Sequence, residues 1–259
     1  MTVVITGAAG TIGSAVAARL PAYGWTVRLF DRVPIDGGLL GDITVPADLD
    51  AAMDGASAVV HLAGVPTEVP WPVLRAANID GTVGVFEAAR RNRVPRIIYA
   101  SSIHAAGFTL AAEPNLPADT PARPDTLYGV SKVFGEALGR YYADRYGLQV
   151  ACLRIGTFAA TPPDRWALSN WLSPDDCGRL VDACLRSARL GYALVWGISA
   201  NTRRTWSLDE GYALGYQPRD DAEDYADSVP AGRPYPSDAF VGGGYTSPGF
   251  GIDEVAARS

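Results

Sequence analysis

Short apolar segments alternate with amphipathic segments from the N-terminus to about residue 156. The apolar runs include VVIT, VRLF, AVVHL and RIIYA. Each is apolar on both faces, which is typical of a strand covered on both sides in a parallel sheet. Helical spacing separates them, as in TIGSAVAARL and TVGVFEAARR. This alternation predicts an α/β fold, a doubly wound parallel sheet of the Rossmann type.

The alternation loosens beyond residue 156, where PPDRWALSNW is irregular. A helical pattern follows in SPDDCGRLVDACLRSA, a strand pattern in YALVWGIS, and the tail after Pro230 is rich in Gly and Pro. No internal repeat or long linker sets these segments apart. We therefore expect residues 1–157 to form the Rossmann domain. Residues 158–259 should form a small annex of the same compact unit, which completes the sheet and binds substrate at its C-terminal edge.

Composition narrows the classes of partner. The chain has 259 residues, a net charge of -6 and no basic run, so we expect no nucleic acid partner. No apolar run approaches the roughly 18 residues that span a bilayer, and the N-terminus enters a strand pattern without a signal sequence. We expect a cytoplasmic protein without a membrane partner.

Three cysteines and two histidines limit the metal chemistry. Cys152 lies in a strand pattern, and Cys177 and Cys184 lie in a helical one, without the spacing of metal ligands. We therefore interpret all three cysteines as small core residues and expect no metal site. His61, within AVVHLAG, is interpreted as a core residue or one close to a cofactor.

A glycine motif follows the first predicted strand. Gly7, Gly10 and Gly13 form G-x-x-G-x-x-G at the start of the first helix, which also holds Thr11 and Ile12. Glycines permit a tight turn and close backbone approach. The free N–H groups and the dipole of the helix N-terminus can then hold a pyrophosphate. In this strand-turn-helix context the motif predicts a dinucleotide cofactor.

Residues at the ends of later strands predict which dinucleotide binds. Asp31 ends TVRLFD, where a carboxylate accepts hydrogen bonds from ribose hydroxyls and repels a 2′-phosphate. This favours NAD over NADP, although Arg32 would partly offset the preference, and the alternative is a surface aspartate that ends a strand. Further contacts are expected from Asp42 and Ile43 near the adenine, and from Leu62, Ala63 and Gly64 beside the pyrophosphate and ribose.

Tyr128 and Lys132 are four residues apart, so they project from one face of a predicted helix. A nearby ammonium and an oxidised nicotinamide both stabilise a phenolate, which would make Tyr128 a general base. Ser102, at the end of the strand RIIYASS, would donate a hydrogen bond to the substrate oxygen. The alternative is that Ser101 and Ser102 only cap a loop. The pattern predicts a Ser-Tyr-Lys site with Ser102, Tyr128 and Lys132 as catalytic residues.

Several motifs carry a family resemblance. TGAAGTIG, HLAG, ASSIH, LYGVSK and CLRIG resemble the extended short-chain dehydrogenase/reductase family, also described as the NAD-dependent epimerase/dehydratase family. DTPARPDTLYGVSKVFGEALGRYYADRYG, with LVWGISAN and GGGYTSPGF, is similar to its bacterial uronate dehydrogenases. The resemblance implies a sugar acid substrate, D-galacturonate or D-glucuronate, oxidised with NAD at C1 to an aldarolactone.

The resemblance also implies a substrate pocket. His104 and the residue before it would contact the sugar, and Ile103 stands where that family typically has asparagine. Arg165 matches an arginine that grips the substrate carboxylate, a role that suits its bidentate fork. The alternatives are a structural His104 and an Arg165 paired with Asp164. Further expected contacts are Thr67, Thr157 and Phe250 with the sugar, and Asn78 with cofactor or substrate.

Three other functions stay open. A nucleotide-sugar epimerase or dehydratase would use the same scaffold, but dehydratases of this type carry Asp-Glu after the catalytic Ser or Thr, where this chain has Ile103-His104. A carbonyl reductase acting on a non-sugar substrate is the second alternative. A non-catalytic NAD-sensing regulator is the third, and the Tyr128-Lys132 pair argues against it. A homo-oligomer is compatible with the sequence.

Overall fold

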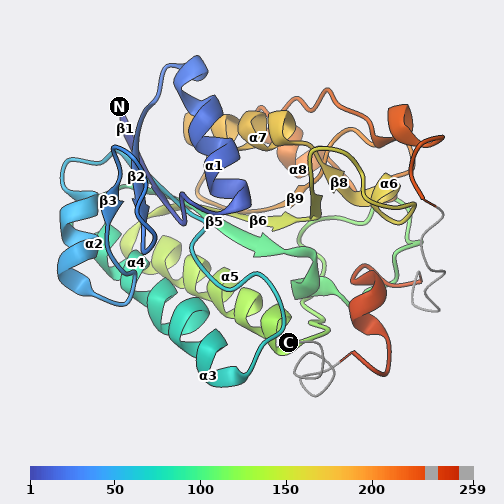
Figure 1. The fold of residues 1–259 in the computed structure, drawn as a ribbon, viewed down its shortest axis with the longest axis horizontal. Helices are drawn as coiled ribbons and strands as arrows, with labels where there is room; N and C mark the ends of the chain where they lie inside the picture. Colours follow the sequence, from blue (N-terminus) through green and yellow to red (C-terminus); the bar gives the residue numbers. More distant parts are fainter. Residues whose placement is uncertain (231–238, 251–259) are drawn as a thin grey trace.

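Seven parallel strands form one sheet in the order β3-β2-β1-β4-β5-β6-β9 (Figure 1). The structure is a computed structural model that describes residues 1–230 and 239–250. The strand order reverses between β1 and β4, and ligands of such sheets bind beyond the carboxyl ends of the strands at that point. The architecture confirms the predicted doubly wound α/β fold.

The carboxyl ends of the central strands align with one another. Thr6 pairs with His61, and Ser102 pairs with Ile155, at neighbouring strand ends. The strands are β1 (Thr2–Thr6), β2 (Thr26–Asp31), β3 (Leu39–Leu40), β4 (Ala58–His61), β5 (Arg96–Ser102), β6 (Gln149–Ile155) and β9 (Tyr192–Gly197), with β7 (Thr157–Phe158) and β8 (Trp171–Leu172) in a separate pair. The loops that follow β1, β4, β5 and β6 therefore meet along one edge of the sheet.

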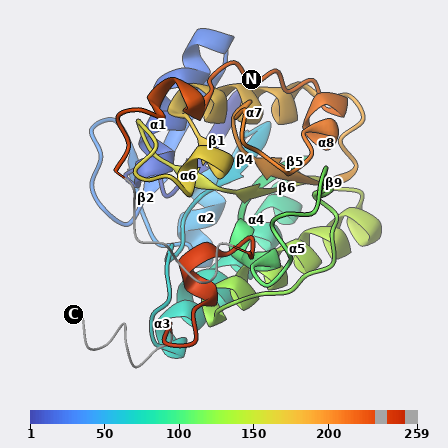
Figure 2. The same ribbon diagram turned by 90° about the vertical axis from the view of Figure 1, so that its right-hand side faces the viewer.

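Helices cover both faces of the sheet (Figures 1 and 2). On one face lie α1 (Thr11–Arg19) and α7 (Pro174–Arg186), and on the other lie α2 (Pro46–Met53), α4 (Gly81–Arg91) and α5 (Leu127–Tyr146). The shorter helices are α3 (Trp71–Leu74), which leads into a π-helical turn at Arg75–Asp80, α6 (Ala167–Asn170) and α8 (Asp209–Ala213). In the described ranges, 3₁₀ turns lie at Leu20–Tyr23, Ile103–Ala106, Ala222–Tyr225 and Gly243–Thr246.

The two faces of the sheet hold separate apolar cores. Val3 and Ile5 of β1 join the core beneath α1 and α7, whereas Val4 joins the core against α2 and α4. Neighbouring strand residues point to opposite faces, which is why these strands are continuously apolar. Cys177 and Cys184 lie in the first core and Cys152 in the second, all buried and free, as predicted. No helix in the described ranges is long and apolar enough to span a bilayer.

The C-terminal segments return to the carboxyl edge of the sheet. β9 forms the edge strand next to β6. Residues 239–242 then run beside the loop after β5, where the Val241 N–H donates to Thr109 O over 2.9 Å and the Gly242 N–H donates to Gly107 O over 2.9 Å. The segment at Gly243–Thr246 thereby reaches the ends of the central strands. Residues 231–238 and 251–259 of the predicted annex lie outside the described residues.

Candidate active site

The glycine loop after β1 has no room for side chains. Gly7 has a φ of 73°, and a Cβ there would lie 2.6 Å from the Ala63 nitrogen. A Cβ on Gly13 would lie 2.1 Å from the Gly7 carbonyl oxygen. The first turn of α1 has no acidic residue, and its N-cap residue, Gly10, has no side chain that could cap the free N–H groups. This open helix N-terminus beside the Leu62–Gly64 backbone fits the pyrophosphate of a dinucleotide.

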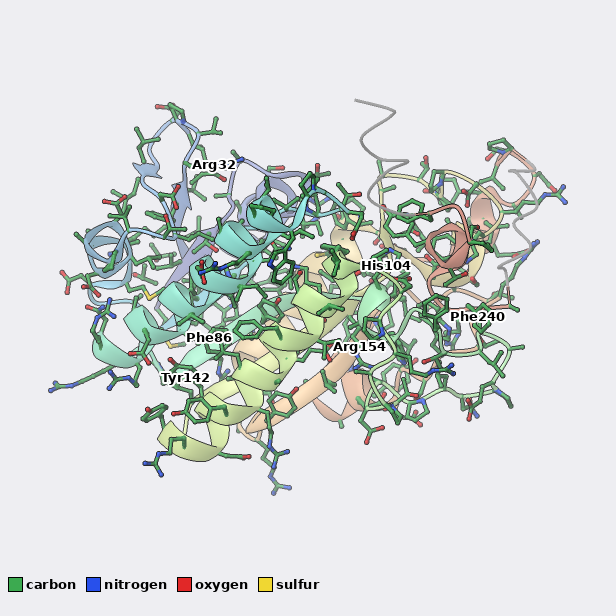
Figure 3. All side chains as sticks on the ribbon, turned by 90° about the horizontal axis from the view of Figure 1, so that it is seen from below. Arg32, Phe86, His104, Tyr142, Arg154 and Phe240 are labelled. Atoms are coloured by element: carbon green, nitrogen blue, oxygen red, sulfur yellow. The ribbon has the colours of Figure 1, made fainter. Side chains whose placement is uncertain are left out.

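Asp31 lies at the end of β2, beside the glycine loop. Its Oδ2 accepts a 2.9 Å hydrogen bond from the Ala9 N–H, and its Oδ1 accepts a 3.0 Å bond from the Val33 N–H. A carboxylate has about four acceptor positions, so about two are left for ribose hydroxyls. Arg32 is exposed and lies apart from His104 in Figure 3.

Asp42 and Ile43, predicted to lie near the adenine, both contact neighbouring parts of the protein. Asp42 accepts hydrogen bonds from the Thr44 N–H and hydroxyl, which hold the pKa of its carboxyl below the usual range. Ile43 packs against α4, because a Cβ on Gly81 would lie 2.5 Å from its Cδ1. Their contact with adenine stays a prediction.

Tyr128 and Lys132 lie on the buried face of α5. The Lys132 ammonium donates a 2.8 Å hydrogen bond to Ala100 O and lies 5.4 Å from the centre of the Tyr128 ring. Burial lowers the pKa of Lys132 to about 8, and the charge of Glu136 opposes this shift. Burial raises the pKa of Tyr128, and the neighbouring Ser102 hydroxyl lowers it in part. The structure therefore brings the three predicted catalytic residues together.

The two serines of the strand tip have different partners. Ser102, the last residue of β5, accepts a 3.2 Å hydrogen bond from the His104 N–H and also contacts Tyr128. Ser101 donates a 2.6 Å hydrogen bond to Glu136 Oε1 on the buried face of α5. Ser101 thus ties the strand to the helix, and Ser102 is left to face the site.

Three buried charged residues support this arrangement, and the sequence did not reveal their roles. Glu68 Oε2 accepts a 2.8 Å hydrogen bond from the Tyr128 N–H. Glu136 receives bonds of 2.9 and 2.8 Å from Nε and Nη2 of Arg154. An arginine within the apolar strand QVACLRI was a usable signal, because a buried guanidinium needs a partner. The loop glutamate carried no comparable signal.

The predicted sugar contacts gather around Tyr245. The rings of His104 and Tyr245 stack with their centres 4.1 Å apart, and Phe250 stacks on the other side of Tyr245 at 4.0 Å. Thr67 Oγ1 lies 3.2 Å from the Tyr245 hydroxyl. His104 Nδ1 also lies 2.8 Å from Asp125 Oδ2. The predicted residues Thr67, His104 and Phe250 thus contact Tyr245 or Asp125. The sequence did not single out these last two, since a Tyr among glycines and an Asp before a helix are common.

Asn78, Thr157 and Ile103 already have structural partners. The Asn78 amide is engaged by the Val65 backbone and by Ser131 Oγ, at 2.7 to 3.0 Å. The Thr157 hydroxyl donates to Asn170 Oδ1 over 2.6 Å, so it can only accept from a sugar. Ile103 is 2% exposed and packs in the apolar core. Their ligand contacts stay predictions.

Arg165 is exposed on the loop before α6 and forms no ion pair within residues 1–230 and 239–250. The alternative pairing with Asp164 is not found among the described residues, and Asp164 Oδ1 instead accepts a 2.9 Å hydrogen bond from the Ala167 N–H. The neighbouring Trp166 ring packs on Gly243, where a Cβ would lie 2.7 Å from the indole. Arg165 is thus on a loop that touches the same segment as Tyr245.

His61 has a structural position, as predicted. It is fully buried at the end of β4, with Nδ1 2.8 Å from Thr6 Oγ1 and Nε2 3.2 Å from Thr82 Oγ1. Burial, followed by the charge of Lys132, lowers its pKa to about 3. His61 therefore stays neutral at physiological pH.

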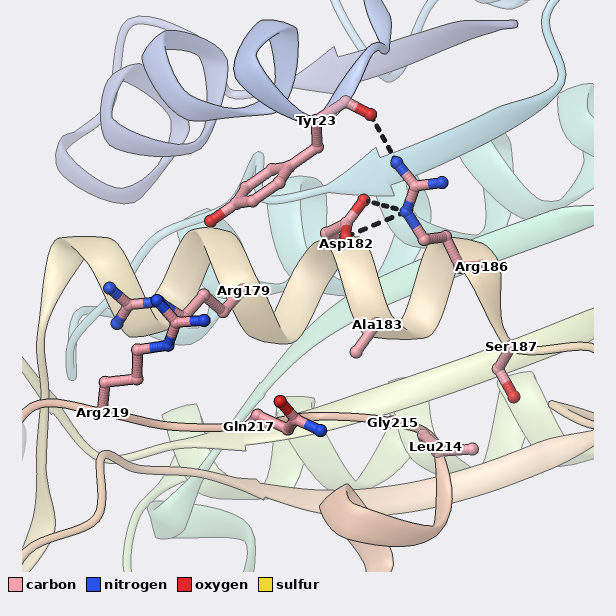
Figure 4. A pocket seen from close by; sticks show the side chains of 10 residues that line it. All are labelled: Tyr23, Arg179, Asp182, Ala183, Arg186, Ser187, Leu214, Gly215, Gln217 and Arg219. Carbon is pink, nitrogen blue, oxygen red and sulfur yellow. Dashed lines mark hydrogen bonds and ion pairs between the residues drawn. The ribbon is translucent and has the colours of Figure 1, made fainter.

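A separate pocket of about 340 Å³ lies beside α7 (Figure 4). Three of its lining residues are arginines, but Arg186 pairs with Asp182, and Arg179 pairs with Asp176 and Asp220. None of the predicted catalytic or cofactor residues lines it. Its charges are largely balanced, so the candidate site remains the cluster at the strand ends.

Comparisons with known proteins agree with this geometry. A model of the NAD dependent epimerase/dehydratase family matches residues 3–203. The uronate dehydrogenase of Agrobacterium fabrum is 38% identical over 245 residues, which cover 92% of this chain and 92% of that protein. The NAD-dependent glucose-6-phosphate dehydrogenase of Haloferax volcanii is 38% identical over 251 residues, which cover 86% and 95%. A crystal structure of a mutant uronate dehydrogenase from Agrobacterium tumefaciens, complexed with NAD, has a TM-score of 0.89 at 35% identity and covers 96% of this chain and 98% of its own.

Proposed function

The chain belongs to the NAD dependent epimerase/dehydratase family, and from this premise we propose that it oxidises a hexuronate at C1 to the aldarolactone with NAD. It is an NAD-dependent dehydrogenase of the uronate dehydrogenase type. The observation that carries the proposal is the meeting of Ser102, Tyr128 and Lys132 beside the open glycine loop.

NAD fits the residues at the strand ends. The glycine loop and the start of α1 would hold the pyrophosphate, and Asp31 would accept from the adenosine ribose. Lys132, the buried cation that lies beside Tyr128, would hold the nicotinamide ribose. When bound, NAD supplies the hydride acceptor and, as the oxidised cation, a positive charge close to Tyr128.

Tyr128 acts as the general base in this proposal. The hydroxyl on C1 of the pyranose lies between Ser102 and Tyr128, and Ser102 orients it through a hydrogen bond. The phenolate takes the hydroxyl proton, the C1–H electron pair leaves as hydride, and the C1–O bond becomes the lactone carbonyl. Burial alone disfavours the phenolate, so the nearby positive charges are needed to form it.

The carboxylate at C6 of the sugar gives the proposal its substrate class. Arg165 is exposed without an ion-pair partner in the described ranges, and a guanidinium binds a carboxylate through two parallel hydrogen bonds. Thr67, His104, Thr157 and Phe250 would contact the ring.

The three free, buried cysteines suit a reducing cytoplasm, which we propose as the compartment.

NADH formation by the purified chain tests the function directly. The panel contains D-galacturonate, D-glucuronate, D-galactose, D-glucose, glucose 6-phosphate and a UDP-sugar, each with NAD. We expect rapid NADH formation with the uronates and little with the neutral hexoses. Preference for glucose 6-phosphate would instead assign the anion site to a phosphate, and silence with every sugar would overturn the proposed function.

A further inference from the structure

Asp125 is a buried carboxylate immediately before the N-cap of α5. Its side chain is 0% exposed, and its Oδ2 lies 2.8 Å from His104 Nδ1. Its Oδ1 accepts a 3.0 Å hydrogen bond from the Thr126 hydroxyl, whose own oxygen accepts from the Gly129 N–H at 3.0 Å. Both carboxylate oxygens therefore act as acceptors for neighbouring side chains.

Three glycines enclose this carboxylate. A Cβ on Gly107 or Gly242 would lie 2.0 or 1.9 Å from Asp125 Oδ2, and a Cβ on Gly129 would lie 3.2 Å from Oδ1. These glycines come from the loop after β5, the C-terminal segment and α5. Such close approach fixes the position of the carboxylate, because any side chain at Gly107 or Gly242 would collide with it.

The contact determines which nitrogen of His104 carries the proton. An ionised carboxylate can only accept, so the Nδ1–H of the imidazole must be the donor. In the neutral ring, Nε2 is then a hydrogen-bond acceptor. Within residues 1–230 and 239–250, Nε2 has no hydrogen-bond partner. The ring is stacked on Tyr245 and meets Tyr128 edge-on with centres 5.9 Å apart.

We propose that Asp125 is a positioning residue for substrate recognition: it keeps the His104 proton on Nδ1, so that Nε2 accepts a hydrogen bond from one ring hydroxyl. The inference rests on the proposed function, because it requires a sugar beside Tyr128. The pocket then favours a sugar whose hydroxyl can donate at that place over its deoxy or deoxyfluoro analogue.

Imidazole ¹⁵N NMR of the wild-type protein reads the tautomer directly. The chain has two histidines, so the spectrum holds two rings, which His61→Gln assigns. We expect neutral His104 to carry its proton on Nδ1 and to have an unprotonated Nε2. A neutral ring with the proton on Nε2 would overturn the proposal. This readout needs neither turnover nor a variant of Asp125.

A double-mutant cycle tests the consequence for substrate binding. An amide at Asp125→Asn cannot accept from both Thr126 and His104, so the Nδ1–H contact is weakened or reversed. We expect KM for the best sugar of the panel to rise roughly tenfold, with NAD affinity and melting temperature nearly unchanged. In the His104→Ala background, Asp125→Asn should cause no further rise, because coupled residues are not additive.

The loss of the Asp125 charge by itself predicts a change in turnover and no rise in KM. The Asp125 carboxylate raises the pKa of Tyr128, so losing its charge would by itself favour the phenolate and faster turnover. Asp144→Asn, at the exposed far end of α5, is the matched control and should leave KM unchanged. A full Asp125→Asn effect in the His104→Ala background, or an unchanged KM, would overturn the proposal. If no sugar is oxidised, the proposed function fails, and the tautomer still decides the assignment of Asp125.

Discussion

The carboxylate of Glu68 accepts a 2.8 Å hydrogen bond from the backbone N–H of Tyr128. Glu68 lies in the loop after β4, whereas Tyr128 lies in the first turn of α5. A helix N-terminus has N–H groups without partners inside the helix, and a carboxylate there is also favoured by the helix dipole. The contact fixes the loop against the turn that presents the general base.

Glu68→Ala should therefore reduce both stability and turnover. We expect the free energy of unfolding to fall by about 1 to 2 kcal/mol, as for the loss of a helix cap, with a lower kcat because Tyr128 is less firmly placed. Urea unfolding and steady-state kinetics measure the two effects. Glu68→Gln keeps an oxygen acceptor and serves as the control, so an equal loss in both variants would argue against the capping role.

Tyr128→Phe removes the proposed base without changing the ring. Turnover should fall roughly 100- to 10,000-fold, the range for a positioned acid-base group, whereas NAD affinity should be nearly intact. NADH formation measures the turnover, and titration with NAD followed by fluorescence measures the affinity for NAD. Substantial residual turnover would show that another group takes the proton.

Asp31→Asn tests the choice between NAD and NADP. The amide oxygen can still accept from the Ala9 N–H, but the charge that repels a 2′-phosphate is lost. We expect the ratio of kcat/KM for NADP to that for NAD to rise roughly tenfold, the effect of about 1.4 kcal/mol of repulsion. Removing Arg32 in addition should reverse part of the gain, and an unchanged ratio in Asp31→Asn would contradict the charge argument.

The fold was predictable because its signals are local. The runs VVIT, AVVHL and RIIYA are apolar on both faces, and only a sheet covered by helices on both sides buries such strands. The glycine spacing was equally informative, since Gly7 and Gly13 lie where a Cβ would meet backbone atoms. In both cases the residues of one short segment are enough to predict its local structure.

The candidate site was predictable only in part, because its remaining contacts join distant segments. Tyr245 reaches His104 from a segment 141 residues later in the chain, and Glu68 reaches Tyr128 from 60 residues earlier. Neither side chain stands in a distinctive local pattern. For Ile103, the family resemblance implied a sugar contact, and this contact stays a prediction, because the side chain packs in the core.

His61 should make stability depend on pH. Its pKa is about 3 in the folded protein and about 6.5 when unfolded, so the unfolded chain binds more protons between these values. Stability is then complete above about pH 6.5 and falls as the pH is lowered, by about 2 kcal/mol from pH 7.5 to pH 5. Urea unfolding at the two pH values measures this loss. His61→Gln should show a correspondingly smaller loss, and an identical loss would exclude His61 as its source.

The proposed role of Arg165 in substrate binding can be measured separately from the reaction at C1. Arg165→Met should raise KM for a uronate roughly 10- to 100-fold, as expected when a charged hydrogen-bonding partner is lost. The kcat should change little, because the side chain contacts the C6 carboxylate and not the reacting carbon. Activity with a neutral hexose, where measurable, should be unaffected, because that sugar has no carboxylate to lose.

Arg165→Lys keeps the charge but not the planar fork, so its KM should lie between those of Arg165→Met and the wild type. A wild-type KM in Arg165→Lys would mean that charge alone attracts the substrate. Equal losses for uronate and neutral hexose would instead assign Arg165 to the structure of its loop, beside Trp166 and Gly243. The uronate-selective loss is therefore the result that connects this exposed arginine to the carboxylate of the sugar.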